Sequence, residues 1–289
     1  MASGRGTGLA VGALLIAMFC FQTGASLAQQ LFPLVGAQGT VALRTGWSAL
    51  ILILFWHPWR ARIGRRNWQA LVVYGAALGT MNFLFYMALR TVPLGIAVAL
   101  EFSGPLAVAL IASRRARDFL WALLAMAGLL LLLPIREASG VSWGGASFAL
   151  GAGVCWALYI IFGQKAGLAH GQYATVLGAI VAALVIMPVG FIHSGWMLFR
   201  PGILAFGLLV AALSSAVPYS LEMVALRRIP APAFGTLMSL EPAMGSLMGL
   251  LLLSQQLSLV QWSAVAMVVL ASMGAALSVT RQPHPRLPD

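Results

Sequence analysis

The amino-acid sequence predicts an all-α integral membrane protein in which ten transmembrane helices form two inverted repeats of five helices each. Two observations lead to this prediction: a composition that is 61% hydrophobic and only 8% charged, and a motif that occurs once in each half of the chain. So few polar residues cannot cover the surface of a water-soluble protein. A chain of 289 residues accommodates ten helices of about 20 residues, the length that crosses a hydrocarbon core of about 30 Å.

Ten apolar runs, almost free of charged residues, follow one another along the chain. The first half contains residues 9–28, 35–56, 70–89, 94–113 and 119–135. The second half contains residues 141–163, 173–192, 203–226, 233–253 and 259–280. Turn and breaker residues separate the runs, among them Pro58, the Pro201-Gly202 pair and Pro230. Each run is therefore predicted to form one membrane-spanning helix.

The first run also permits a second interpretation, as a cleaved signal peptide. Its end, residues 25–28 (Ala-Ser-Leu-Ala), has the small residues of a signal-peptidase site before Gln29. However, the run is longer than a usual signal-peptide core and contains Gln22 and Thr23. Its removal would also leave the first half one helix short of the second, so we interpret it as a retained helix.

The distribution of positive charge predicts the orientation in the membrane, because basic residues in short loops resist translocation. With the N-terminus in the cytoplasm, the outside loops contain only Arg90, Arg136 and Arg200. The cytoplasmic segments then contain Arg5, Arg60, Arg62, Arg65, Arg66, Arg114, Arg115, Arg117, Lys165, Arg227, Arg228, Arg281 and Arg286. We therefore expect both termini on the cytoplasmic side of the plasma (inner) membrane.

A short motif is found in both halves. Residues 86–93 read YMALRTVP, and residues 223–230 read MVALRRIP. Each copy precedes a span that contains a glutamate and then a proline, LGIAVALEFSGP from Leu94 and APAFGTLMSLEP from Ala231. The third and fourth spans thus correspond to the eighth and ninth. Since five is an odd number, the two halves, residues 1–136 and 137–289, must enter the membrane in opposite orientations, as in secondary transporters.

Ionisable side chains inside the spans carry the strongest functional signal, because a charge in the bilayer is costly unless it is paired or faces water. Glu101 and Glu241 lie at mirrored depths, roughly 12 Å from opposite faces. Pro105 removes the amide donor to the Glu101 carbonyl, and Pro242 directly follows Glu241. Both acids therefore adjoin an interrupted helix, where a transporter places substrate and proton sites. The alternative is a structural role, in which each glutamate stabilises helix packing by pairing with Arg44 or with a nearby hydroxyl group.

Two further charges lie within the spans. Arg44 lies close to the midplane, where it could bind a substrate carboxylate or neutralise a glutamate; we expect the pairing. Glu222 lies near the cytoplasmic end of its span, either as a gate that admits protons or as a side chain that reaches water beside Arg227 and Arg228. Polar and aromatic side chains at membrane depth complete the candidate cavity: Asn82, Tyr86, Trp156, Tyr159 and Tyr219.

Other classes of protein find no support. The basic residues are scattered between apolar runs and form no continuous face for nucleic acid. Cys20 and Cys155 lie in apolar runs without a CxxC motif, and the histidines, including His170 and His193, are expected in loops or the tail, so we expect no disulfide, metal or other cofactor. The sequence contains no catalytic motif and no nucleotide-binding loop. We expect no enzymatic activity, and any uphill transport must use an ion gradient.

Four segments carry a resemblance to known transporters. They read LFPLVGAQGTVALR from Leu31, TVPLGIAVALEFSGPLAVAL from Thr91, GVCWALYIIFGQKAG from Gly153 and PYSLEMVALRRIPAPAFGTLMSLEPA from Pro218. Over nearly its whole length, the chain resembles the EamA-type branch of the drug/metabolite transporter superfamily, most closely its threonine and homoserine exporters. The resemblance implies ten helices in two inverted halves, a cavity open alternately to each side, and export of amino acids in exchange for protons. These exporters typically have lysine at the position of Gln29, a departure at the outer end of the pathway.

The sequence therefore favours an amino-acid exporter whose cavity offers carboxylates to an α-ammonium group and Arg44, or the N-terminus of a half-helix, to an α-carboxylate. Its expected partners are the amino acid, protons and the lipid bilayer. One alternative keeps the fold but changes the cargo to a drug, a polyamine or a sugar derivative. Another is a membrane-embedded enzyme, which would need a pair of catalytic groups that the sequence does not show.

Overall fold

The chain is all-helical in the computed structural model, which describes residues 2–60, 68–112, 116–133, 141–171, 173–226, 234 and 237–280 and has no strand among them. Helices long and apolar enough to cross a membrane lie within residues 8–29, 32–56, 68–88, 143–170 and 173–199. Shorter apolar helices lie within residues 94–108, 119–132, 201–216, 241–253 and 259–274. The predicted all-α, multi-pass membrane class is confirmed.

The helices follow the predicted runs in order. The first half contains α1 (Ala2–Gln29), α2 (Phe32–Trp56), α3 (Trp68–Ala88), α4 (Leu94–Glu101), α5 (Ser103–Ala112) and α6 (Ala116–Leu132). The second half contains α7 (Trp143–His170), α8 (Tyr173–Ser194), α9 (Pro201–Ala211), α10 (Val217–Leu226), α12 (Glu241–Leu253) and α13 (Leu259–Thr280). Short 3₁₀ turns span Pro58–Arg60 and Gly195–Phe199, and a π-helical turn spans Ala212–Ala216.

Two histidines expected in loops are instead helical. His170 is the last residue of α7, and His193 lies in the last turn of α8. Both helices continue until glycines that adopt left-handed φ angles, Gly171 at 58° and Gly195 at 56°. Because such angles are strained for other residues, these glycines define the helix ends. His284 lies outside the described residues.

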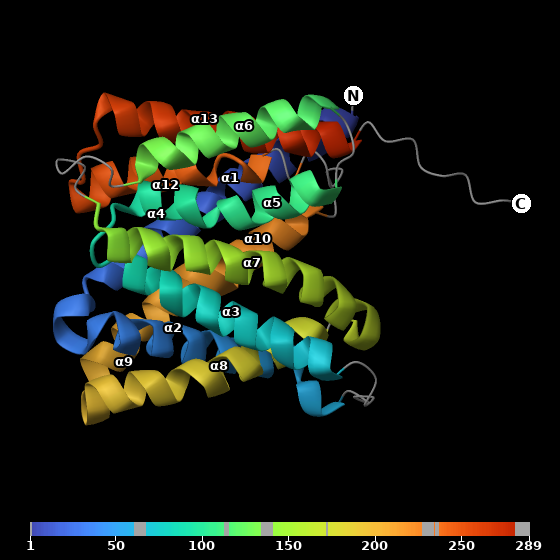
Figure 1. Cartoon of the computed structure of the whole chain (residues 1–289). Coiled ribbons are helices and arrows are strands. Elements are labelled where there is room, and N and C mark those ends of the chain that lie inside the picture. The colour runs from blue at the N-terminus through green and yellow to red at the C-terminus, as the bar shows by residue number, and fades with distance from the viewer. Residues whose placement is uncertain are drawn as a thin grey trace, which may run out of the picture.

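The helices run side by side as a bundle, with the start of α1 and the end of α13 at the same end (Figure 1). The connections from α1 to α2, α3 to α4, α8 to α9 and α12 to α13 lie at the opposite end. This alternation agrees with a chain that crosses the membrane repeatedly. Most of the basic residues behind the predicted orientation, among them Arg62, Arg115 and Arg227, lie outside the described residues.

Large apolar side chains cover the outside of the bundle, whereas small residues are common inside it. Phe55 and Leu184 are 75% and 69% exposed, while Ala42 and Ala182 are fully buried. In a water-soluble protein these exposures would be unfavourable, but lipid tails solvate them. Small interior residues allow helices to approach closely in a membrane, where van der Waals packing replaces the hydrophobic effect between helices.

Two predicted spans are broken beside their glutamates. The fourth span is divided at Phe102, so Glu101 is the last residue of α4. In the ninth, residues 239–240 form a turn and Glu241 is the first residue of α12, with Pro242 in its first turn. Each break lies three residues before a proline, Pro105 or Pro242, which cannot donate the next helical hydrogen bond.

Glycine allows the α4–α5 break to pack directly on α7. A Cβ atom on Gly104 would overlap the Gly153 carbonyl, and one on Gly153 would lie 2.7 Å from the Glu101 carbonyl oxygen. On its other side α4 packs antiparallel to α12, where Gly95 contacts Ser246 and the Leu94 amide donates to Gln255 Oε1 at 2.8 Å. These contacts hold the two broken spans against each other through α4 and α12.

The most extensive helix contacts join the first half of the chain to the second. Helix α3 packs on α7, α2 on α8, α6 on α13, α1 on α10, and α4 on α12. Figure 1 shows α6 beside α13 along one edge of the bundle, and α2 with α8 along the other. The central core therefore forms only when both halves are present.

Candidate functional site

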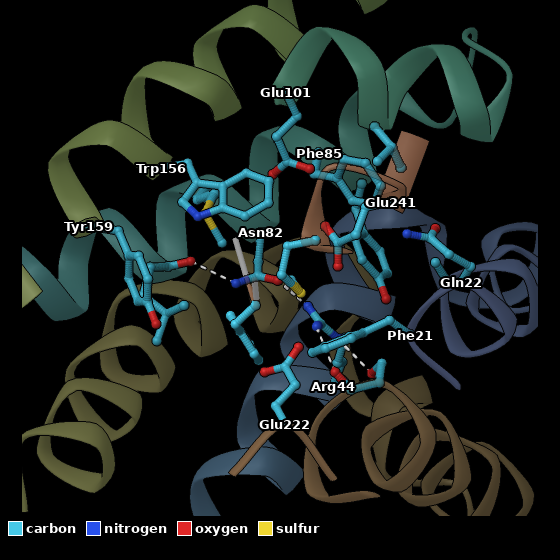
Figure 2. Close-up of a pocket in the computed structure, with 18 residues that line it drawn as sticks. Phe21, Gln22, Arg44, Asn82, Phe85, Glu101, Trp156, Tyr159, Glu222 and Glu241 are labelled. Atoms are coloured by element: carbon cyan, nitrogen blue, oxygen red, sulfur yellow. Dashed lines mark hydrogen bonds between the residues drawn. The ribbon is translucent and has the colours of Figure 1, made fainter. Parts of the chain in front are cut away.

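A cavity of about 330 Å³ lies between the two halves (Figure 2). Its walls come from α1, α2, α3, α4, α7, α10 and α12, together with the π-helical turn before α10 and the residues just before α12. Eight of the nine predicted site residues line it: Arg44, Asn82, Tyr86, Glu101, Trp156, Tyr159, Glu222 and Glu241. For the ninth, Tyr219, the structure describes the backbone in α10 but not the side chain.

Neutral groups hold Arg44 in the cavity. Its Nε donates to Ser214 Oγ at 2.7 Å and its Nη2 donates to the Ser214 carbonyl at 3.1 Å. Its Nη1 donates to Asn82 Oδ1, and the guanidinium lies 5.6 Å from the centre of the Tyr86 ring. Asn82 is fixed in turn by a 2.7 Å bond from its Nδ2 to the Leu78 carbonyl. Several helices therefore define the position of one guanidinium.

The acceptor for Arg44 lies in an irregular turn of the eighth span. Proline has no amide hydrogen, so Pro218 leaves the carbonyl four residues earlier, that of Ser214, without its helical donor. A π-helical turn over Ala212–Ala216 precedes Pro218, and such turns often occur at functional sites. Arg44 supplies the missing donor across the cavity.

The expected pairing of Arg44 with a glutamate stays a prediction: Arg44 interacts electrostatically with Glu101 but forms no hydrogen bond with a glutamate in the described part of the chain. Among the described residues, the hydrogen-bond partners of Arg44 are Ser214 and Asn82, which stabilise the guanidinium without neutralising it. A guanidinium has five N–H donors. Its bonds to these two residues use three, so two remain for a ligand, the number that a bidentate carboxylate requires.

Glu101 and Glu241 face the same cavity from the two broken spans. Each is only 7% exposed. In Figure 2 both carboxylates extend from α4 and α12 toward the region that holds Arg44, with Glu222 on the far side of Arg44. Glu101 interacts electrostatically with Glu241 and Arg44. The cavity therefore presents two acidic groups and one cationic group to a single bound molecule.

A second cavity of about 220 Å³ adjoins the first and shares five residues with it: Arg44, Leu78, Asn82, Tyr159 and Glu222. It continues along Leu52, Tyr74 and Thr175, near the end of α2 and the starts of α3 and α8. Glu222 thus lies where the two cavities meet. The arginines expected beside it, Arg227 and Arg228, lie outside the described residues.

Aromatic side chains form the α7 wall. The rings of Trp156 and Phe102 meet edge to face with centroids 5.5 Å apart, and Tyr159 stacks on Tyr74 at 5.0 Å. Gln29, at the end of α1, lines neither cavity. No cluster of three His, Cys, Asp or Glu side chains suited to a metal ion occurs in the described part of the chain.

Sequence reasoning missed two polar residues of the cavity, Ser214 and Gln22. The sequence signal for Ser214 is Pro218, because a proline removes the amide donor to the carbonyl group four residues earlier. Gln22 was considered only as an argument against a signal peptide, although a lone amide in an apolar helix is itself a polar group at membrane depth.

Comparisons with known proteins agree with the fold. The model of the EamA-like transporter family matches residues 143–277. The chain is 52% identical over 272 residues to the threonine/homoserine exporter RhtA of Salmonella typhimurium, covering 94% of this chain and 92% of that one. It is 50% identical over 270 residues to RhtA of Escherichia coli K12, with 93% and 92% covered. A crystal structure 18% identical in sequence superposes with a TM-score of 0.59 over 96% of this chain and 99% of its own.

Proposed function

This chain belongs to the EamA-like transporter family, and on that premise we propose that it exports threonine- or homoserine-like amino acids from the cytoplasm by proton antiport. Membership of this family makes it a membrane transporter and not an enzyme. The choice of cargo draws on the RhtA relatives, which are named as threonine/homoserine exporters and match the chain over almost its full length.

The observation that carries the proposal is the distribution of charge in the central cavity. Arg44 keeps two N–H donors for a carboxylate, and Glu101 and Glu241 lie buried in the same cavity. A free amino acid at neutral pH carries one carboxylate and one ammonium group on the same carbon atom. The cavity therefore complements a zwitterion with its guanidinium on one side and its carboxyl groups on another.

Alternating access in our proposal uses the ten helices as two inverted repeats, residues 1–136 and 137–289. Two observations support this repeat. The breaks at Phe102 and Ser239 fall at equivalent positions of the repeated motif, three residues before Pro105 and Pro242. The packing also agrees with a two-fold relation, because the contact of α3 with α7 has its counterpart in that of α10 with α1. Inverted halves of this kind can rock about a central site.

The adjoining cavity gives the substrate a route to that site. It leads from Arg44 and Glu222 toward the ends of α2, α3 and α8 that, in the predicted orientation, face the cytoplasm. We propose that an amino acid enters through it, passes Glu222, and binds between Arg44 and the two buried glutamates. Tyr86, which is 1% exposed beneath the Arg44 guanidinium, would lie on the outer side of the bound molecule.

Counterflow into proteoliposomes tests the function directly. Vesicles that contain the purified protein and unlabelled threonine should accumulate labelled threonine or homoserine transiently, and vesicles with the same interior but no protein should not. Uptake of labelled polyamines or drugs in place of amino acids would instead assign a different cargo to the same fold. Release of a chemically altered product would contradict the transporter assignment itself.

The proposed orientation gives a separate prediction. Reporter fusions after Arg62 and Arg115 should show a cytoplasmic location, and fusions after Pro33 and Glu137 should show the outside, because basic residues in short loops stay in the cytoplasm. Paired alkaline phosphatase and green fluorescent protein fusions measure both outcomes in whole cells. An outside location for the loop that contains Arg62 would reverse the proposed direction of the pathway.

A further inference from the structure

Gln22 of α1 is a buried polar residue to which the transport mechanism has so far assigned no role. Its side chain lines the central cavity and is only 5% exposed. No described residue forms a hydrogen bond with its side-chain amide. Buried amides are nearly always hydrogen-bonded, because an unpaired one loses its bonds to water without replacement. An amide that faces a cavity, and that has no partner in the described part of the chain, is available to whatever the cavity binds.

Close packing fixes where this amide lies. One turn further along α1, Ser26 Oγ donates to the Gln22 carbonyl at 2.9 Å, and a Cβ atom on Gly24 would lie 2.8 Å from Ser214 Cβ. On the α12 side, a Cβ atom on Gly245 would lie 3.4 Å from Gln22 Oε1. The side chain thus reaches the cavity over a glycine of α12, next to Glu241, as Figure 2 shows.

The polar groups of the cavity divide into separate tasks. In the proposed function, Arg44 binds the α-carboxylate and Glu101 or Glu241 binds the α-ammonium group. Once these two groups of an amino acid are held, its side chain must point to a third part of the wall. Much of the remaining wall is apolar, with Phe85, Trp156 and Met238.

We propose that Gln22 binds the side-chain hydroxyl group of the transported amino acid and so determines a preference for hydroxy amino acids over aliphatic ones of the same size. This inference rests on the proposed function. A primary amide has both N–H donors and a carbonyl acceptor, so it can pair with a hydroxyl group in either direction. Valine, which has a methyl group where threonine has its hydroxyl, would leave the amide unpaired on binding, and such a site rejects the analogue.

The test compares threonine with valine as competitors of labelled threonine counterflow. Gln22→Met keeps an unbranched side chain of similar length but removes the amide, so the preference for threonine over valine should fall by about tenfold, the value of one hydrogen bond. The loss should come from weaker competition by threonine and homoserine, with competition by valine unchanged or stronger. Gln256→Met, on the exposed connection between α12 and α13, is the matched control and should keep the wild-type preference.

The outcomes separate this inference from the function on which it rests. A wild-type protein that transports no amino acid refutes the proposed function. A wild-type protein that prefers threonine, beside a Gln22→Met variant with the same preference, refutes the role of Gln22. If Gln22→Met does not transport, thermal stabilisation of the purified variant by each amino acid replaces the transport assay: equal shifts with threonine and valine support the role, and a retained preference for threonine overturns it.

Discussion

Replacing the proton-coupling glutamate by glutamine is expected to abolish export driven by a pH gradient while leaving a folded protein in the membrane. Glu101 and Glu241 are the two candidates, since both are buried and line the central cavity. Burial penalises the charged form of a carboxyl group, and an approaching ammonium group favours it. Proton and substrate would therefore compete for one site, as exchange requires. Glutamine keeps the shape of the side chain but cannot release a proton.

The measurement is export of labelled threonine from preloaded vesicles, with the outside made more acidic than the inside. The wild-type rate should rise with this gradient, and the rate of the coupling variant should stay at the level of protein-free vesicles. Asp118→Asn, near the start of α6, is the control and should respond as the wild type does, because no residue of α6 whose side chain the structure describes lines either cavity. If Glu101→Gln and Glu241→Gln both export at the wild-type rate with unchanged pH dependence, the coupling proposal is wrong and these acids act only in helix packing.

Arg44→Ala is expected to weaken substrate binding by roughly 30-fold or more, the effect of truncating one partner of a buried, hydrogen-bonded charge pair. The physical reason is that the alanine variant leaves the substrate carboxylate without its bidentate donor. Arg44→Lys should restore little of the lost substrate affinity, because an ammonium group cannot form the two parallel hydrogen bonds of a planar guanidinium. The half-saturating threonine concentration in counterflow measures the effect.

Arg200→Ala provides the comparison, because Arg200 is exposed at the connection before α9 and lines neither central cavity. From the sequence alone, a buried Arg44–glutamate pair would predict a folding defect of about 3–5 kcal/mol in Arg44→Ala. The neutral partners in the structure predict a smaller loss of folded yield. A variant with normal affinity but little folded protein would show that Arg44 acts only in folding.

Much of this fold is predictable because its determinants are local in the sequence. Apolar length predicts the spans, loop charge predicts their orientation, and a proline inside or at the start of a helix predicts each break. The same logic identified eight residues of the cavity, because polar groups within a span must face either one another or water. The helix ends at Gly171 and Gly195 were less clear, since glycine also occurs freely inside membrane helices.

The partners of Arg44 could not be predicted in the same way. Its acceptor is a carbonyl group in another helix 170 residues away, and no periodicity within α2 indicates which helix it faces. The sequence contains both glutamates and serines at membrane depth, so charge alone could not indicate that the hydrogen bonds of Arg44 go to Ser214 and Asn82. The role of Gln22 could not be predicted for the same reason. An amide on α1 can form a hydrogen bond with a neighbouring helix or face a cavity, and the sequence does not distinguish the two.

The packing between the two halves has a consequence for biogenesis. Since α1, α2, α3, α4 and α6 find their most extensive contacts in the second half of the chain, the first half must remain in the bilayer during synthesis without those neighbours. Arg44 then lacks Ser214, but Asn82, on α3 of its own half, is already available to it. Tertiary assembly is consequently a late event, and two separately expressed halves should be degraded when alone yet rescue each other when made in the same cell.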